Sequence, residues 1–204
     1  HTHRQEAAMP PLTQALIVIN VLVFLLQQVL GDLLVRWLAL WPLGSGIFMP
    51  WQLGSYAFLH GGLMHLAFNM YGLWLFGSEL ERVWGSRRFG VFYAASVLMA
   101  ALVQLGVTAM VGSSAPTVGA SGGLFGLLIG FAMVFPRRTI TPLLPPIPMP
   151  VPVFVTLYGA LELTLGVTGS ATGIAHFAHL GGLLGGWLVM RYWRGQAPFG
   201  QRDS

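Results

Sequence analysis

The chain has 204 residues, of which 55% are hydrophobic and only 8% are charged. Soluble domains usually carry about 25% charged residues, so a bundle of membrane helices suits this composition better than a soluble fold. The absence of cysteine excludes disulfide, zinc-thiolate and thiol-nucleophile chemistry. The ten basic residues are all arginines in short connecting stretches, so the net charge of +4 does not indicate a nucleic-acid partner.

Six apolar segments follow one another along the chain, each near the ~20 residues that a helix needs to cross the hydrocarbon core. Their bounds are roughly Leu12–Leu30, Phe58–Phe76, Phe89–Val111, Gly119–Phe135, Val151–Val167 and Gly173–Tyr192. We therefore predict an all-α, polytopic membrane protein built as a bundle of six transmembrane helices. Nine of the ten arginines lie at one end of these segments, and only Arg36 lies at the other. The positive-inside rule then places both termini in the cytoplasm.

Two connections between the segments are unusual. Gly31–Ala57 is long, carries few charges and contains Trp37, Trp41 and Trp51. Because tryptophan favours the membrane interface, we expect a membrane-associated first loop. The stretch Pro142–Pro152 holds six prolines and cannot be a helix interior, so we interpret it as a stiff cytoplasmic link. The fifth segment, which follows this link and has few small residues, is a candidate for the mobile side through which a substrate helix enters.

Polar groups within a span are costly and are therefore candidates for function. The first such cluster surrounds Ser121, in the sequence Gly119-Ala120-Ser121-Gly122-Gly123 at the outer start of the fourth segment. A helix start exposes unpaired N–H groups that stabilise negative charge. Ser121 could thus act as a nucleophile and supply an oxyanion-hole N–H. A helix cap beside a small-residue packing face explains the same residues equally well.

The second cluster contains His176 and His179 on the sixth segment. Glycines follow His179 at i+3 and i+7, and glycines also follow Gly122 at i+4 and i+8. Two such faces suit close helix–helix packing, which would bring Ser121 within reach of His179. Packing alone needs no histidine, and a histidine bonded to a carbonyl is the alternative.

The predicted depths agree with this pairing. Ser121 lies 16 residues before Arg137, and His179 lies 12 residues before Arg191. At a rise of 1.5 Å per residue, they lie about 24 Å and about 18 Å from the cytoplasmic end, both in the outer half.

The third cluster contains His65 and Asn69, which share a helix face at i and i+4. Both lie in the outer half of the second segment and could hold an oxyanion. From the residues alone, His60 is best interpreted as a solvated histidine near a Gly-Gly turn. Glu162, on the fifth segment, could orient a histidine, but a structural hydrogen bond within the bundle is the simpler interpretation. The sequence therefore suggests a Ser–His dyad without a third, acidic member.

These residues resemble the rhomboid family of intramembrane serine proteases over nearly the whole chain. Four ordered motifs carry the resemblance: FLHGGLMHLAFNMYGLW (Phe58–Trp74), ELERVWGSRRF (Glu79–Phe89), GASGGLFGLLIG (Gly119–Gly130) and AHFAHLGGLLGG (Ala175–Gly186). The resemblance implies that Ser121 is the nucleophile and His179 the general base and acid. It also implies that His65, Asn69 and the N–H of Ser121 form the oxyanion hole.

Other positions match the family pattern as well. Gly119 opens the G-x-S-G motif, and His60 matches a histidine with a supporting role. Glu81 and Arg82 match a structural pair at the inner end of the second segment. Phe125 stands where the family has a variable aromatic residue that packs on the histidine.

The resemblance implies an intramembrane serine endopeptidase of a minimal, bacterial six-helix form. It would lie in the inner (cytoplasmic) membrane, with its active site towards the extracytoplasmic side. We expect a cytoplasmic tail at residues 1–11, the rhomboid protease domain at 12–193 and a second cytoplasmic tail at 194–204. Its partners would be the lipid bilayer and transmembrane protein substrates, and it would need neither metal nor cofactor. The sequence leaves the oligomeric state open.

Two other functions are compatible with a polar cluster in a membrane protein. A catalytically silent, rhomboid-like protein would bind membrane helices and should tolerate the loss of Ser121. A small transporter or channel would line a pathway with polar residues, but such a pathway should continue to the cytoplasmic side.

Overall fold

A computed structural model describes residues 8–169 and 175–199, with the side chains of 165–169 and 175 left aside. The outer parts of both predicted tails, with Arg4 and Arg202, lie outside the described residues. So does Gly173, the predicted start of the sixth segment. The domain bounds at 12 and 193 thus remain predictions.

The protein is mostly helical, which agrees with the predicted all-α class. Five helices match predicted apolar segments closely: α1 (Pro11–Leu30), α6 (Ser86–Val111), α7 (Ser121–Val134), α8 (Val151–Gly169) and α9 (Ala175–Trp193). By length and composition, α1 and α6 are able to cross a membrane, whereas α7 and the first part of α8 are apolar but shorter. The count of six spans therefore stays a prediction.

The second predicted segment has different bounds in the structure. Phe58 belongs to a short turn, η2 (Tyr56–Phe58), and the helix begins only at α4 (Leu63–Gly72). Gly62, just before it, is extended with φ of −170°. The helix then continues through a π-helical stretch, η3 (Leu73–Gly77), into α5 (Ser78–Trp84). The predicted start at Phe58 was wrong because apolar residues continue through the Gly61-Gly62 turn, where the helix does not.

The first loop contains short helices. These are α2 (Asp32–Leu38), η1 (Leu43–Ser45) and α3 (Gln52–Ser55), followed by η2. Within the loop, the indole of Trp51 donates to the carbonyl of Trp37 at 2.8 Å, and the two rings stack. The hydroxyl of Tyr56 donates to the carbonyl of Val97 on α6 at 2.6 Å, which anchors the end of the loop to the bundle.

The proline-rich link forms a small hairpin rather than a plain connection. Its strands β1 (Thr139–Ile140) and β2 (Met149–Pro150) pair antiparallel, with Thr139 opposite Pro150. Helix α8 begins directly after β2, where Pro152 fits the first turn because that turn needs no N–H donor.

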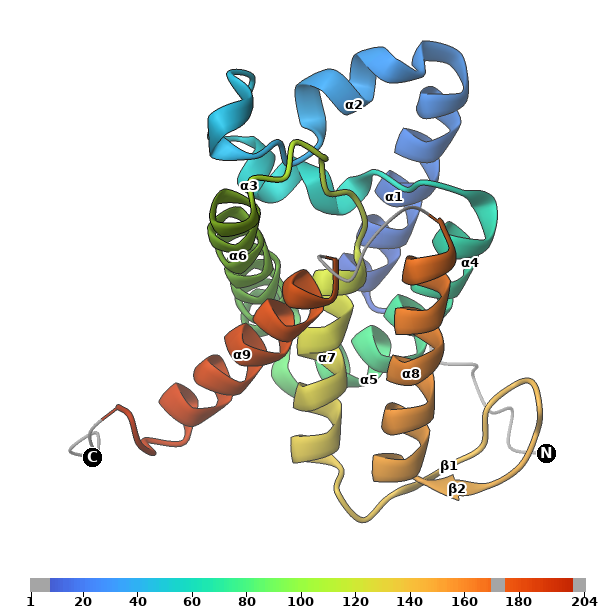
Figure 1. Ribbon diagram of the computed structural model, residues 1–204. Helices are drawn as coiled ribbons and strands as arrows, with labels where there is room; N and C mark the ends of the chain where they lie inside the picture. The colour runs from blue at the N-terminus through green and yellow to red at the C-terminus, as the bar shows by residue number, and fades with distance from the viewer. Residues whose placement is uncertain (1–7, 170–174, 200–204) are drawn as a thin grey trace.

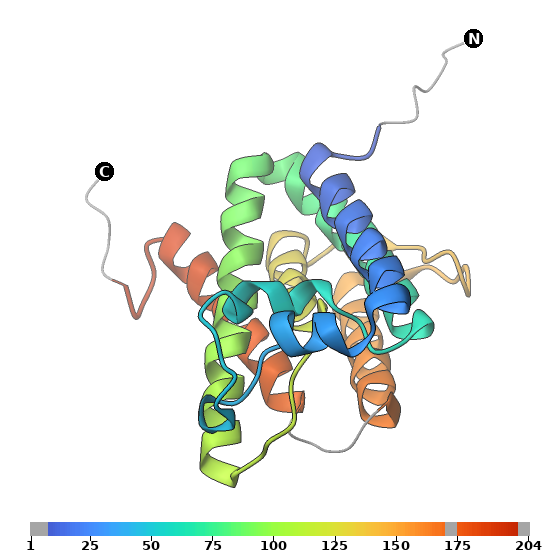
Figure 2. The ribbon, with the colours of Figure 1, turned by 90° about the horizontal axis from the view of Figure 1, so that it is seen from above.

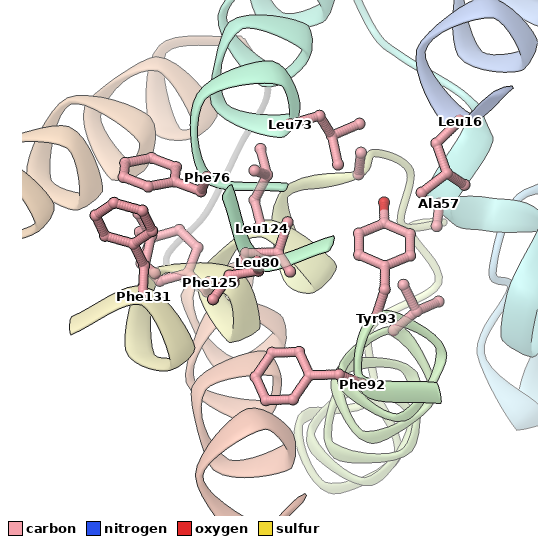
Figure 3. Packing of buried hydrophobic residues seen from close by; sticks show 14 of the residues in the cluster. Leu16, Ala57, Leu73, Phe76, Leu80, Phe92, Tyr93, Leu124, Phe125 and Phe131 are labelled. Carbon is pink, nitrogen blue, oxygen red and sulfur yellow. The ribbon is translucent and has the colours of Figure 1, made fainter. Parts of the chain in front are cut away.

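Helix α7 stands at the centre of the bundle, with α6 and α9 on one side and α8 on the other (Figure 1). Figure 2 gives the same arrangement from above, with α2 and α3 lying across the bundle. Every α7 residue from Ser121 to Leu128 is buried. Figure 3 shows the core around it, where the ring of Phe131 meets the edge of Phe76 with centroids 5.1 Å apart.

The start of α1 is capped by a side chain from another helix. The Glu81 carboxylate accepts from the backbone N–H groups of Leu12 and Thr13, from the Thr13 hydroxyl and from the Ser86 hydroxyl, at 2.7–2.8 Å. Arg82 instead pairs with Glu79 at 3.4 Å. The two members of the predicted Glu-Arg pair therefore have separate structural partners, and Glu81 joins α5 to α1.

Candidate active site

Ser121 and His179 lie against each other in the interior. The Oγ atom of Ser121 is 2.8 Å from Nε2 of His179, and the residues are only 6% and 5% exposed. Ser121 is the first residue of α7, so its N–H belongs to the group that a helix start leaves without intrahelical partners. The arrangement places a hydroxyl, a base and a helix N-terminus at one point.

Glycines bring the two helices together, as the spacing predicted. A β-carbon on Gly182 would overlap the carbonyl oxygen of Gly122, and one on Gly186 would lie 2.9 Å from the α-carbon of Gly126. Helices α7 and α9 are therefore in backbone contact beside the pair. Gly130 departs from the prediction, because it faces Phe92 instead of α9. Eight residues exceed two turns of 3.6, so the third glycine rotates off the shared face.

Phe125 lies one turn after Ser121 and covers the imidazole of His179. The two rings stack with centroids 4.5 Å apart and planes 16° from parallel. The stack fixes the plane of the imidazole while leaving Nε2 directed at the serine. Within the described part of the chain, Nδ1 of His179 has no hydrogen-bond partner. This geometry fits a dyad without an acidic third member.

Gly119 separates Ser121 from His65. Its φ of +122° is one that residues with a side chain rarely adopt, and its N–H donates to the carbonyl of Tyr56 at 3.0 Å. A β-carbon here would lie 3.1 Å from Cε1 of His65 and 3.7 Å from Oγ of Ser121. The serine and His65 therefore border the same small space, which a larger residue would fill.

His65 and Asn69 contact each other and Glu162. The Nε2 atom of His65 lies 3.1 Å from Oε1 of the Glu162 carboxylate, and the His65 side chain is 21% exposed. The amide of Asn69 satisfies both its ends when Nδ2 faces Glu162, at 2.6 Å from Oε1, and Oδ1 accepts from Nε2 of His60 at 3.0 Å. We adopt that orientation because a carboxylate only accepts hydrogen bonds.

His60 is buried, so the interpretation as a solvated histidine was wrong. It is 2% exposed, and its backbone N–H and carbonyl pair with the side-chain amide of Gln27 at 3.0 Å each. Its imidazole reaches Asn69. The Gly-Gly turn that suggested exposure faces outward, while His60 itself is held between α1 and α4.

Two contributions were missed from the sequence: Tyr56 holds Gly119 in place, and Gln27 holds His60. Glu162 bonds to a histidine, as the sequence allowed, and its partners are His65 and Asn69. Gln27 and Glu162 were visible as polar residues within apolar segments, but their partners were not. No group of three or more His, Asp or Glu side chains among the described residues is arranged to hold a metal ion.

Fold and site together define a helical-bundle protein with a buried serine–histidine pair, in which a histidine can activate a hydroxyl. The chain belongs to the rhomboid family: the model of the Rhomboid domain matches residues 48–195. It is similar to the rhomboid protease GlpG of Klebsiella pneumoniae subsp. pneumoniae, with 40% identity over 96 residues, which cover 46% of this chain and 34% of that protein.

Two other similar proteins are also rhomboid proteases. The rhomboid protease GlpG of Serratia proteamaculans is 35% identical over 96 residues, which cover 46% of this chain and 34% of that protein. The rhomboid protease GluP of Bacillus subtilis is 41% identical over 78 residues, which cover 38% of this chain and 14% of that protein. The chain thus spans about a third or less of the length of these curated relatives.

Proposed function

We propose that this protein is an intramembrane serine endopeptidase that cleaves transmembrane segments of membrane proteins with a Ser121–His179 dyad. The 2.8 Å approach of the serine hydroxyl to the imidazole carries the proposal. Membership of the rhomboid family and the similarity to relatives named as rhomboid proteases support it.

The first half of the reaction acylates the serine. His179 accepts the hydroxyl proton at Nε2 while Oγ of Ser121 attacks the scissile carbonyl carbon. The carbonyl electron pair moves to oxygen, where the N–H of Ser121 and the side chains of His65 and Asn69 stabilise the charge. When the tetrahedral intermediate collapses, the C–N bond breaks and His179 gives its proton to the leaving amine.

The second half hydrolyses the resulting ester. A water molecule attacks the acyl carbon and loses a proton to His179, the bond to Oγ breaks, and the proton returns to Ser121. Water must therefore reach the site. The partial exposure of the His65 side chain, 21%, supports access from that side. A substrate helix must also unwind locally, so we expect helix-breaking or small residues near the cleaved bond.

The protein would act as an integral membrane protein with six spans and both termini in the cytoplasm. The arginine distribution supports this orientation, with the site in the extracytoplasmic half. The assignment to an inner membrane and the protease domain at residues 12–193, flanked by cytoplasmic tails, are part of the same proposal. The alternative is a catalytically silent protein of the same fold that binds membrane helices. The presence of both Ser121 and His179 favours the enzyme.

The proposal is tested by cleavage of a fluorescent transmembrane substrate by the purified protein in detergent. Wild type should cut, while folded Ser121→Ala and His179→Ala should not. Cleavage by Ser121→Ala would refute the mechanism. A folded wild type that binds several substrates but cuts none would favour the silent binding protein.

A further inference from the structure

Glu162 is a fully buried carboxylate that faces the proposed oxyanion hole. It lies on α8, and its Oε1 atom accepts hydrogen bonds from Nε2 of His65 at 3.1 Å and from Nδ2 of Asn69 at 2.6 Å. These two donors come from α4. A carboxylate that receives both is bound by strong, charge-assisted hydrogen bonds. Glu162 therefore joins α8 to α4 at the site itself.

In the adopted orientation of Asn69, the hydrogen bonds among these four side chains run towards Glu162. His60 donates from Nε2 to Oδ1 of Asn69, Asn69 donates to Glu162, and His65 donates to Glu162. The carboxylate has no proton to give, so it is the final acceptor. An oxyanion would need the same two protons. The carboxylate oxygen thus occupies the acceptor position that a tetrahedral intermediate requires.

We propose that Glu162 is a latch, whose carboxylate occupies the oxyanion-hole donors and must withdraw before the site becomes competent. This inference rests on the proposed function and concerns its regulation. Two negatively charged oxygens that share one pair of donors repel each other, so the carboxylate and the oxyanion exclude each other. Catalysis then requires that Glu162 leave His65 and Asn69.

The position of Glu162 on α8 couples this withdrawal to helix motion. Tyr158, one turn earlier on the same face, donates its hydroxyl to the carbonyl of Phe68 at 2.6 Å and stacks on the Phe68 ring. Tyr158 and Glu162 are thus two successive attachments of α8 to α4. The adjoining face of α8, with Leu157 and Leu161, is exposed. A substrate segment that displaces α8 would pull the carboxylate out and free the donors.

The first test measures how fast Ser121 reacts with a small fluorophosphonate probe, whose reaction needs the oxyanion hole but no substrate helix. Glu162→Gln keeps the shape but weakens the acceptor, and Glu162→Leu removes it. The rate constant should rise about threefold in the first and about tenfold in the second. Thr164→Val removes an exposed hydroxyl that donates to the carbonyl of Ala160 on the same helix, and it should leave the rate unchanged.

Opposite effects would overturn the latch. If Glu162 serves to orient His65 and Asn69, then Glu162→Gln, with an unchanged melting temperature, reacts more slowly than wild type, and Glu162→Leu reacts most slowly. An unchanged rate in both variants would equally contradict the proposal. Glu162→Gln is the decisive variant, because glutamine is nearly isosteric with glutamate and an unchanged melting temperature shows that the variant is folded.

The second test needs no activity. The chain has no cysteine, so Leu102→Cys on α6 and Leu157→Cys on α8 would carry the only two spin labels. Both positions are exposed, and α6 and α8 lie on opposite sides of α7 (Figure 2). Adding Glu162→Leu should lengthen the distances measured between the two spin labels. An unchanged distribution would overturn the latch, whereas a wild type that never reacts with the probe at Ser121 would count against the proposed function.

Discussion

The backbone of Gly182 on α9 lies directly against the backbone of Gly122 on α7. A β-carbon on Gly182 would overlap the carbonyl oxygen of Gly122 and lie 2.8 Å from its carbonyl carbon. Gly122 follows Ser121 directly, and Gly182 is one turn beyond His179. This backbone contact therefore determines how closely the hydroxyl and the imidazole approach.

Gly182→Ala should separate the two helices and move the hydroxyl of Ser121 away from the imidazole of His179. We expect a loss of about 1–3 kcal/mol in the free energy of unfolding, since overpacking typically costs this much. Cleavage by the folded fraction should fall about 100-fold, because small displacements of reacting groups are costly. Gly106→Ala, on α6 with open space around it, is the matched control and should lose neither stability nor activity. Equal behaviour of the two variants would contradict this account.

Phe125 should act through the orientation of His179. Phe125→Tyr retains the ring face and should stay within about twofold of wild type, whereas Phe125→Leu should lower kcat about tenfold. Phe131→Leu, in the same helix but packed edge to face with Phe76, serves as the control for lost packing. Steady-state kinetics beside thermal unfolding separates the effects. If Phe131→Leu lowers kcat as much as Phe125→Leu, the stack has no specific role.

Asn69 should contribute to the reaction rate rather than mainly to folding. Removing one oxyanion-hole donor typically costs about 100- to 1,000-fold in kcat, and we expect Asn69→Ala to fall in this range. Asn20→Ala removes another fully buried asparagine, whose side-chain amide donates to the carbonyl of Leu16 within α1. That control should change stability but not kcat. Similar kcat values for the two variants would argue against the oxyanion-hole assignment.

Glu81 should stabilise the fold by capping α1. Glu81→Gln weakens four hydrogen bonds to a buried carboxylate and should cost about 2–3 kcal/mol of unfolding free energy. Glu79→Gln is the matched control. It removes a partly exposed carboxylate that pairs with Arg82 and Arg138, and it should cost less than about 1 kcal/mol.

Glu81 should also make the stability of the fold depend on pH. Burial acts to raise the pKa of Glu81, but hydrogen bonds from Thr13, Leu12 and Ser86 outweigh it, so the pKa lies below its ordinary value. Because the pKa is lowered in the folded state, the Glu81 carboxylate stabilises the fold at pH values above the ordinary carboxyl pKa. This stabilisation is lost as the pH falls through the pKa of the folded state. Melting temperatures of wild type should therefore drop across that acidic window, and those of Glu81→Gln should drop less. Parallel curves would contradict the assignment.

The apolar segments and the glycine spacing predicted most of the fold that positions the site. The predicted ends at Leu30 and Val111 and the predicted start at Val151 agree with the structure, because a glycine or a proline lies next to each of them. The start at Phe58 failed because hydrophobicity does not distinguish a buried turn from a helix. The short helices of the first loop were missed for a related reason: their tertiary contacts, rather than periodicity, stabilise them.

The approach of Ser121 to His179 was foreseeable because glycines line one face of each of their two helices. The surroundings of His60 and Glu162 were not. Each lies on one helix and finds its partner on another, and sequence spacing describes only neighbours on the same helix. The roles of the site residues in catalysis remain predictions that the following measurement addresses.

The central claim is that the hydroxyl of Ser121 is a nucleophile activated by His179. Intact-mass analysis after treatment with a fluorophosphonate tests it directly. We predict the addition of one phosphonyl group, located by peptide mapping to Ser121, absent in Ser121→Ala and at least about 100-fold slower in His179→Ala. An adduct at another residue, or an undiminished rate in folded His179→Ala, would contradict the account.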